Sequence, residues 1–297
     1  MISTIPLWGA RAPHNAGKRN RTVDVHAWLF PDVMTAAPAV YLAAIVAAVL
    51  LTGFSKGGFG GGLGVLATPL MMQVLPANTA LAMMLPILIV CDIFTLRHFP
   101  GEWDPRSFWR IAGGTTAGIV AGCALLVFFG RPDVNGERWL KLFVGGVSVL
   151  FCALKAWAVW GRKAGSGGGR KPGFILGTVM GLAAGVATML AHAAGQIVGI
   201  YFLSQRLDRR VFVGTTARYY LTFNTLKIPF FFLAGALSDR SYITFDTLKW
   251  ELWLIPLCGL GVAAGAWLNR HMTGNVFTAI VYSLLFITGV RMLVQAW

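Results

Sequence analysis

Eight long apolar segments constrain this chain more than any other feature of its sequence. A helix that crosses the apolar core of a bilayer needs about 20 consecutive, mostly apolar residues. The segments that approach this length are 39–56, 79–97, 107–129, 139–160, 173–191, 211–234, 248–268 and 276–296. We therefore expect an all-α polytopic membrane protein with about eight transmembrane helices.

The composition of the chain excludes an ordinary water-soluble domain. Only 12% of its 297 residues are charged, against about 25% in soluble domains, so there is too little charge to cover an apolar core. The net charge of +14 comes mainly from residues between the apolar segments, where it sets membrane orientation, and no nucleic-acid partner is expected. The four cysteines lie in apolar segments without a C-x-x-C pair, so we expect no disulfide framework, metal or cofactor.

A basic, glycine-rich stretch at 161–172 divides the chain near its middle. It contains four basic residues and no acidic residue, which is typical of a cytoplasmic loop and of a flexible linker. We expect a disordered basic tail at 1–37, a first transmembrane repeat at 38–160 and, after the linker, a second repeat at 173–297.

The two halves repeat the same order of elements, and each contains an interrupted helix. The interruptions are the glycine-rich 55–62 and the polar 191–196. Broken backbone survives at membrane depth only where protein or a watery cavity covers it. Paired interruptions in a duplicated chain are typical of secondary transporters, whose site lies where the repeats meet. The repeats are inverted if the interrupted segments are re-entrant hairpins and parallel if they cross once, and the sequence leaves both open.

Three small-residue motifs predict close contacts between helices. They are Gly118-x-x-x-Gly122, Gly177-x-x-x-Gly181-x-x-x-Gly185 and Gly261-x-x-x-Gly265. Glycine at this spacing lets two helix backbones approach within a bilayer. We expect these contacts to form within one chain, and a homodimer stays open as an alternative.

Polar groups in the interruptions and in segment 211–234 mark the predicted substrate site. An ionisable side chain at the centre of a membrane helix costs about 3 kcal/mol or more, so it indicates function. Bare N–H groups at a helix start bind anions, and so do cationic and amide side chains. The predicted substrate-binding residues are Lys56, Gly57, Gly58, Gly60, Gly61, Gly62, His192, Gly195, Gln196, Arg218, Asn224 and Lys227.

Asp92 is the one carboxylate within a clear span before the linker. We expect it to balance a buried cation, for which the candidates are Lys56, Lys227 and Arg218, or to carry a coupling proton. Purely structural alternatives remain for two of the other residues. Lys56 would then extend to the membrane interface, and His192 would cap a carbonyl of the unwound backbone.

Several separated motifs point to one family. In the first half they are 53–64, Pro69-Leu70-Met71, 85–89 with Asp92, and 101–104; in the second half they are Ala191-His192-Ala193, 205–208, 212–216 and Asn224-x-x-Lys227-x-Pro229. Together they cover about residues 39–296 and resemble the sulfite exporter TauE/SafE family, also called the sulfonate uptake permease family. The chain departs from the family where Gly195-Gln196-Ile197 replaces the usual Gly-Pro-Pro, and where Arg218-Tyr219-Tyr220 replaces an apolar stretch.

The resemblance implies a multispan permease for sulfite, a sulfonate or another sulfur-containing oxyanion, in uptake or export, in a bacterial cytoplasmic membrane. The residues themselves favour alternating access around a midplane anion site within the bilayer, with a proton as a candidate coupling ion. We predict that the chain is not an enzyme. A membrane-embedded hydrolase with a Ser–His pair and an anion channel are the alternatives from other classes.

Overall fold

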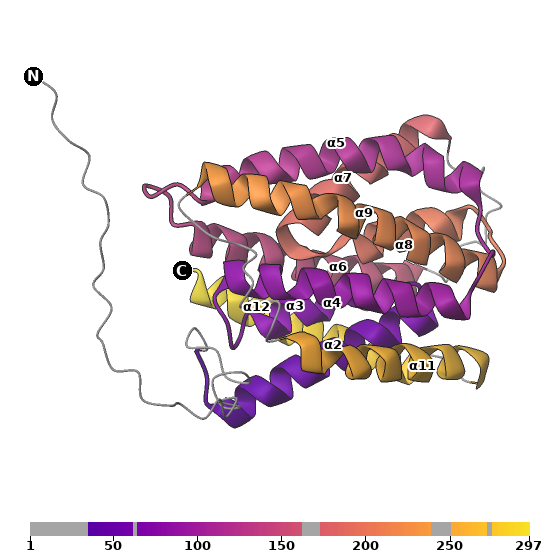
Figure 1. Cartoon of the computed structure of the whole chain (residues 1–297), viewed down its shortest axis with the longest axis horizontal. Helices are drawn as coiled ribbons and strands as arrows, with labels where there is room; N and C mark the ends of the chain where they lie inside the picture. Colours follow the sequence, from indigo (N-terminus) through magenta and orange to yellow (C-terminus); the bar gives the residue numbers. More distant parts are fainter. Residues whose placement is uncertain (1–34, 62–63, 162–172, 239–250, 272–274) are drawn as a thin grey trace, which may run out of the picture.

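The computed structural model describes residues 35–61, 64–161, 173–238, 251–271 and 275–297. Within these ranges the regular elements are all helices, as the apolar segments predict, and most run along the long axis of the molecule (Figure 1). They are α2 (Pro38–Phe59), η1 (Gly64–Leu66), α3 (Ala67–Met71), α4 (Ala77–His98), α5 (Pro105–Phe129), α6 (Gly136–Gly161), α7 (Phe174–Ala191), α8 (Ala194–Ser204), α9 (Arg209–Leu237), η2 (Leu252–Leu254), α11 (Ile255–His271) and α12 (Asn275–Gln295).

Five helices of the described chain are long and apolar enough to cross a membrane, namely α2, α4, α5, α7 and α9. The other three predicted spans coincide largely with α6, α11 and α12, and their crossing stays a prediction. Most of the predicted tail 1–37 and nearly all of the linker 161–172 lie outside the described residues.

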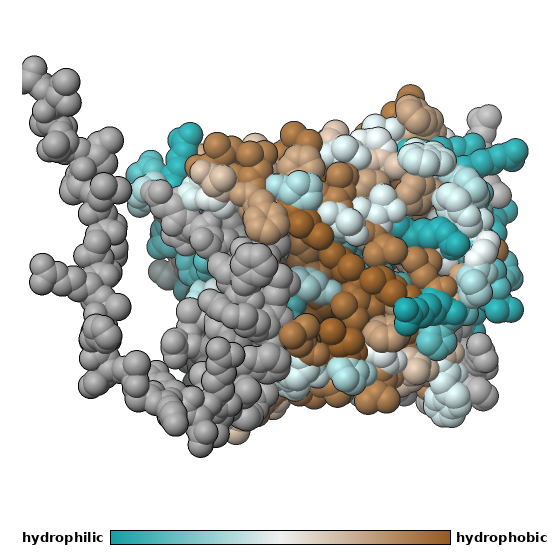
Figure 2. Space-filling model, in the orientation of Figure 1, coloured by the Kyte–Doolittle hydropathy of each residue, from teal (hydrophilic) through white to brown (hydrophobic). Residues whose placement is uncertain are grey.

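Large apolar side chains cover the outer surface of the bundle. Ile175 is 80% exposed, Leu203 66% and Trp109 67%, which would be costly around a whole bundle in water but is favourable in contact with lipid. Hydrophobic residues occupy the middle of the face in Figure 2, and hydrophilic residues gather at its right end. This arrangement fits a bundle whose long axis crosses a bilayer.

Two tightly packed helix pairs, α2 with α11 and α5 with α7, contain the predicted small-residue motifs. A Cβ atom added to Gly118 would lie 2.2 Å from the carbonyl oxygen of Leu182, and one added to Gly57 would lie 2.2 Å from that of Val262. Only glycine permits backbones to approach this closely. In both pairs the contacts advance in the same direction along the two helices, so each pair is parallel.

The first interruption reverses the chain. Residues 55–59 are still helical, and α2 ends at Gly60 and Gly61, whose φ angles of 61° and 81° are left-handed. Glycine adopts this conformation without a steric penalty. The chain then returns through η1 and α3, so that the N–H of Thr35 donates to the carbonyl of Val74 at 2.9 Å. Together α2, η1 and α3 form a first hairpin.

The second interruption makes a similar reversal. Helix α7 ends at His192, whose φ of 52° is left-handed although it is not glycine. Helix α8 then runs back along α7, and the Tyr201 hydroxyl lies 3.1 Å from a Cβ atom built on Gly177. Together α7 and α8 form a second hairpin, with His192 at its tip.

Contacts at the two ends of the bundle give the directions of the helices. Arg210 and Glu102 form an ion pair of 3.0 Å, and the N–H of Asp104 donates to the Thr215 hydroxyl at 2.9 Å. The start of α9 therefore lies beside the loop that joins α4 to α5. The far end of α9 lies beside the far end of α5, where a Cβ atom on Gly130 would touch Ser238. Helices α4 and α9, which pack against each other, thus run in opposite directions.

Candidate functional site

A small polar cavity lies where the tips of the two hairpins meet. Its volume is about 20 Å³, of the order of the space that one water molecule needs. The residues that line it come from α2, α4, α7, α8 and α9 and from the segment between α2 and α3. They are Lys56, Gly61, Gly64, Leu88, Thr188, His192, Ala194, Gly195, Tyr220 and Asn224.

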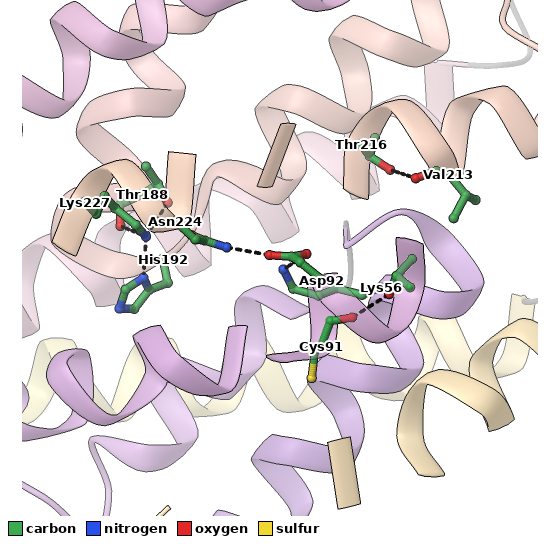
Figure 3. A network of polar contacts seen from close by, with 10 residues as sticks. Lys56, Cys91, Asp92, Thr188, His192, Val213, Thr216, Asn224 and Lys227 are labelled. Atoms are coloured by element: carbon green, nitrogen blue, oxygen red, sulfur yellow. Dashed lines mark hydrogen bonds and ion pairs between the residues drawn. The ribbon is translucent and has the colours of Figure 1, made fainter. Parts of the chain in front are cut away.

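A buried ion pair forms one side of the site (Figure 3). The Lys56 ammonium, 5% exposed, contacts Oδ1 of the fully buried Asp92. The side-chain amide of Asn224 donates to Oδ2 at 2.8 Å, and the Lys56 Nζ lies 4.8 Å from the centre of the Tyr220 ring. Both carboxylate oxygens of Asp92 are therefore occupied, which fixes this side chain as the counter-ion of Lys56.

A second buried cation forms the other side (Figure 3). Nζ of Lys227 lies 3.0 Å from the Thr188 hydroxyl, 3.3 Å from the Thr188 carbonyl and 2.8 Å from Nδ1 of His192. Nε2 of His192 lies 2.9 Å from the carbonyl oxygen of Leu81. A carbonyl only accepts, so Nε2 carries the hydrogen and Nδ1 accepts from Lys227.

The charges of these groups do not cancel. Counted as ionised, Lys56 and Lys227 contribute two positive charges and Asp92 one negative charge, which leaves a formal excess of one positive charge at the cavity. The described residues show no carboxylate in contact with Lys227, whose hydrogen-bond partners are neutral. A bound monoanion would complete the balance, which is why this arrangement is suited to an anion.

The start of α8 points a helix N-terminus at the same cavity. Ala194 and Gly195 occupy the first turn of α8 and line the cavity, and the N-cap residue Ala193 provides no side-chain hydrogen bond. The first N–H groups of a helix have no partner within it, and the helix dipole adds partial positive charge there. This terminus is therefore a second source of anion-binding groups.

Comparison with known families finds a match over most of the chain. Residues 45–292 match the sequence model of the sulfite exporter TauE/SafE family. The chain belongs to this family. It is thus a multi-pass membrane protein of a transporter family. No curated protein and no solved structure matched it significantly.

Five of the residues predicted to bind substrate in this TauE/SafE protein line the cavity, namely Lys56, Gly61, His192, Gly195 and Asn224. The predicted binding of the anion by the glycine N–H groups at 57–61 does not fit the structure, in which these groups have other partners. Gly57 and Gly58 lie inside α2 and pack against α11, so their N–H groups belong to helical hydrogen bonds. The N–H groups of Gly60 and Gly61 both donate to the carbonyl of Ser55. Gly62 lies outside the described residues.

Three further predicted residues do not line the cavity. Lys227 lies behind it and holds Thr188 and His192 in place. Gln196 accepts a hydrogen bond of 2.7 Å from the Tyr282 hydroxyl of α12. The guanidinium carbon of Arg218 in α9 lies 5.3 Å from the centre of the ring of Trp103, which belongs to the loop between α4 and α5. Gln196 and Arg218 therefore belong to other parts of the TauE/SafE structure.

Two lining residues with polar side chains were missed among the predicted binding residues. Thr188 lies one helical turn before His192, and a hydroxyl at that spacing in an apolar helix was an available signal. Tyr220 lies one turn before Asn224, and its ring covers Lys56. Each of them makes a contact between a hairpin and α9, Thr188 with Lys227 and Tyr220 with Lys56. A single sequence does not reveal such contacts.

Proposed function

We propose that this protein is a secondary transporter that carries sulfite, a sulfonate or a related sulfur oxyanion across a bacterial cytoplasmic membrane. One observation carries the proposal: the buried Lys56 ammonium lines a cavity at the tips of two hairpins, and a second buried ammonium and one carboxylate contact other residues of its lining. Membership of the TauE/SafE family supports a sulfur-containing anion as substrate.

The proposal includes two inverted repeats, at 38–160 and 173–297, joined by the linker 161–172. In this proposal α2 corresponds to α7, α4 to α9, α5 to α11 and α6 to α12. The packing of α2 against α11 is then the counterpart of the packing of α7 against α5. Under the same correspondence α4 packs against its own counterpart α9, and α6 against α12. The opposite directions of α4 and α9 support inversion, with each hairpin re-entering from its own side of the membrane.

Each residue at the cavity has a proposed role in alternating access. Lys56, Asn224 and the N-terminus of α8 bind the anion. His192 lines the site between them, and its ring is held in place by Leu81 and Lys227. Asp92 keeps Lys56 ionised and in place, and Lys227 orients His192 and Thr188. Because the cavity is small, we place the anion there only after one hairpin has moved away from the other, which opens the site toward one side.

The alternative of a serine hydrolase finds little support. Gly53-Phe54-Ser55-Lys56-Gly57 has the order of a G-x-S-x-G nucleophile motif, but that motif acts on a strand-to-helix turn and these residues lie inside α2. Both ring nitrogens of His192 already have partners, Leu81 and Lys227. Neither nitrogen is therefore placed to accept a proton from a serine.

Flux of intact labelled sulfite into proteoliposomes tests the proposal. We expect saturable uptake by the purified wild type and loss of uptake in Lys56→Met, which removes an anion-binding charge. Lys141→Met is the matched control, because Lys141 pairs with Glu137 at 3.2 Å on the half-exposed face of α6 and such surface pairs contribute about 1 kcal/mol or less. Uptake by Lys56→Met at the wild-type rate, with correct insertion, would refute the site.

The same assay separates the other classes of function. Release of a chemically altered product would indicate an enzyme, and unsaturable flux far faster than a carrier cycle would indicate a channel. Thermal unfolding in the presence of sulfite, sulfate, taurine or phosphate ranks the ligands, since an anion that binds the folded protein raises its melting temperature.

A further inference from the structure

Glu251 is a buried carboxylate outside the anion cavity. It directly precedes η2, its side chain is 5% exposed, and neither of its oxygens has a hydrogen-bond partner within the described chain. It lines a second cavity of about 260 Å³ between α4, η2 and α11. Among the described residues, no other carboxyl, hydroxyl, amide or basic side chain lines this cavity.

The surroundings of Glu251 favour its neutral acid. Helix α4 presents only Pro86, Ile87 and Val90 to the cavity. Among the residues that the structure describes, the titratable groups that interact with Glu251 are Tyr41 of α2 and Cys258 of α11, and neither is a cation. Burying a carboxylate as an ion without a partner costs several kcal/mol more than burying it protonated.

The lining also selects the ion that Glu251 can bind. A metal cation in an oxygen site needs about six ligands. The described lining of the cavity provides one carboxylate, surrounded by hydrocarbon and a thiol. A single carboxylate is sufficient for a proton, because the proton forms a covalent O–H bond and needs no further ligands.

Helix α4 connects this cavity to the anion site. Pro86 lies inside α4 and lacks an N–H group, so the helix is weakened there. Leu81 before this point accepts the hydrogen bond of His192, and Asp92 after it holds Lys56. A bend of α4 at Pro86 would move these two contacts relative to each other. In addition, α11, which contributes Cys258 to the cavity, packs against α4.

We propose that Glu251 carries the coupling proton of this transporter, and that its protonation and deprotonation act on the anion site through α4. This inference rests on the proposed function and assigns its coupling group. Symport of one proton with one monoanion moves no net charge, and no covalent step other than formation and cleavage of the O–H bond is required.

Two transport assays on the full chain in proteoliposomes test this role. The first measures accumulation of labelled sulfite driven by a pH gradient, and the second measures exchange of labelled for unlabelled sulfite without a gradient. Glu251→Gln mimics the permanently protonated acid, so we expect exchange at about the wild-type rate and gradient-driven accumulation no higher than in empty liposomes. Asp133→Asn, on the exposed loop between α5 and α6, is the matched control and should retain both activities.

The outcomes separate this inference from the proposed function. Accumulation by Glu251→Gln at the wild-type level, or a wild type that exchanges sulfite without responding to a pH gradient, would overturn the role of Glu251. Lys56→Met is expected to lose both accumulation and exchange, because it removes an anion-binding charge. A wild type that neither accumulates nor exchanges sulfite would overturn the proposed substrate instead.

An infrared measurement decides the protonation of Glu251 without any substrate. The purified wild type at neutral pH should show the C=O stretching band of a buried carboxylic acid. This band should persist in Asp133→Asn and disappear in Glu251→Gln. An unchanged spectrum in folded Glu251→Gln would show that Glu251 is not the protonated group, and the inference would fail even if sulfite is not the substrate.

Discussion

Lys56 and Asp92 illustrate how a buried ion pair responds to the loss of one partner. In Asp92→Asn the Lys56 ammonium remains buried without a carboxylate, and removal of one partner of such a pair costs about 3–5 kcal/mol. We expect a lower melting temperature in detergent for Asp92→Asn, and partial recovery in the double variant Lys56→Met/Asp92→Asn, which removes both charges. A double variant less stable than Asp92→Asn would contradict the pairing.

The sequence predicted part of this site and missed the rest for a physical reason. Lys56, His192 and Asn224 were predicted because polar residues are conspicuous in apolar segments. The partner of Asp92 was left open among three cations, because contacts between distant helices depend on packing that one sequence does not show. The buried carboxylate of Glu251 was available as a signal within the segment 248–268, but nothing in the sequence indicates the cavity that it lines.

At the level of elements, neighbouring glycines of α5 differ sharply in their surroundings. A Cβ atom on Gly114 would lie 2.0 Å from the Thr178 carbonyl oxygen of α7, whereas one on Gly113 would meet nothing within 4 Å. Gly114→Ala therefore has to push α5 and α7 apart, which we expect to cost about 1–3 kcal/mol of stability or more. Gly113→Ala should leave stability unchanged or raise it by about 1 kcal/mol, because alanine favours the helix.

Thermal unfolding of the two purified variants in the same detergent checks this pair. Equal melting temperatures would show that α5 and α7 do not pack as described. The motifs themselves were predictable, since small residues at helical spacing are visible in the sequence. Their pairing, α5 with α7 and α2 with α11, was not, because the same motif fits any helix that presents small residues.

At the level of the whole molecule, the charges at the two ends give an orientation. One end of the bundle contains the loops 99–104 and 205–208, with Arg206, Arg209 and Arg210. Helix α6 ends at this end of the bundle and α7 begins there, and the basic linker 161–172 connects the two. Short basic loops remain in the cytoplasm. We therefore expect this end of the bundle to face the cytoplasm, with the loop between α5 and α6 on the opposite side.

Single cysteines at the two ends of α5 test this orientation. Pro100 and Asp133 are both exposed and lie in loops at opposite ends of α5. In intact cells a membrane-impermeant maleimide should label Asp133→Cys, while Pro100→Cys should react only after the cells are permeabilised. The native protein gives the background, since Cys91, Cys123 and Cys258 are buried and Cys152 is partly buried. Labelling of both variants in intact cells would place the two loops on one side of the membrane, and α5 would then not cross it as described.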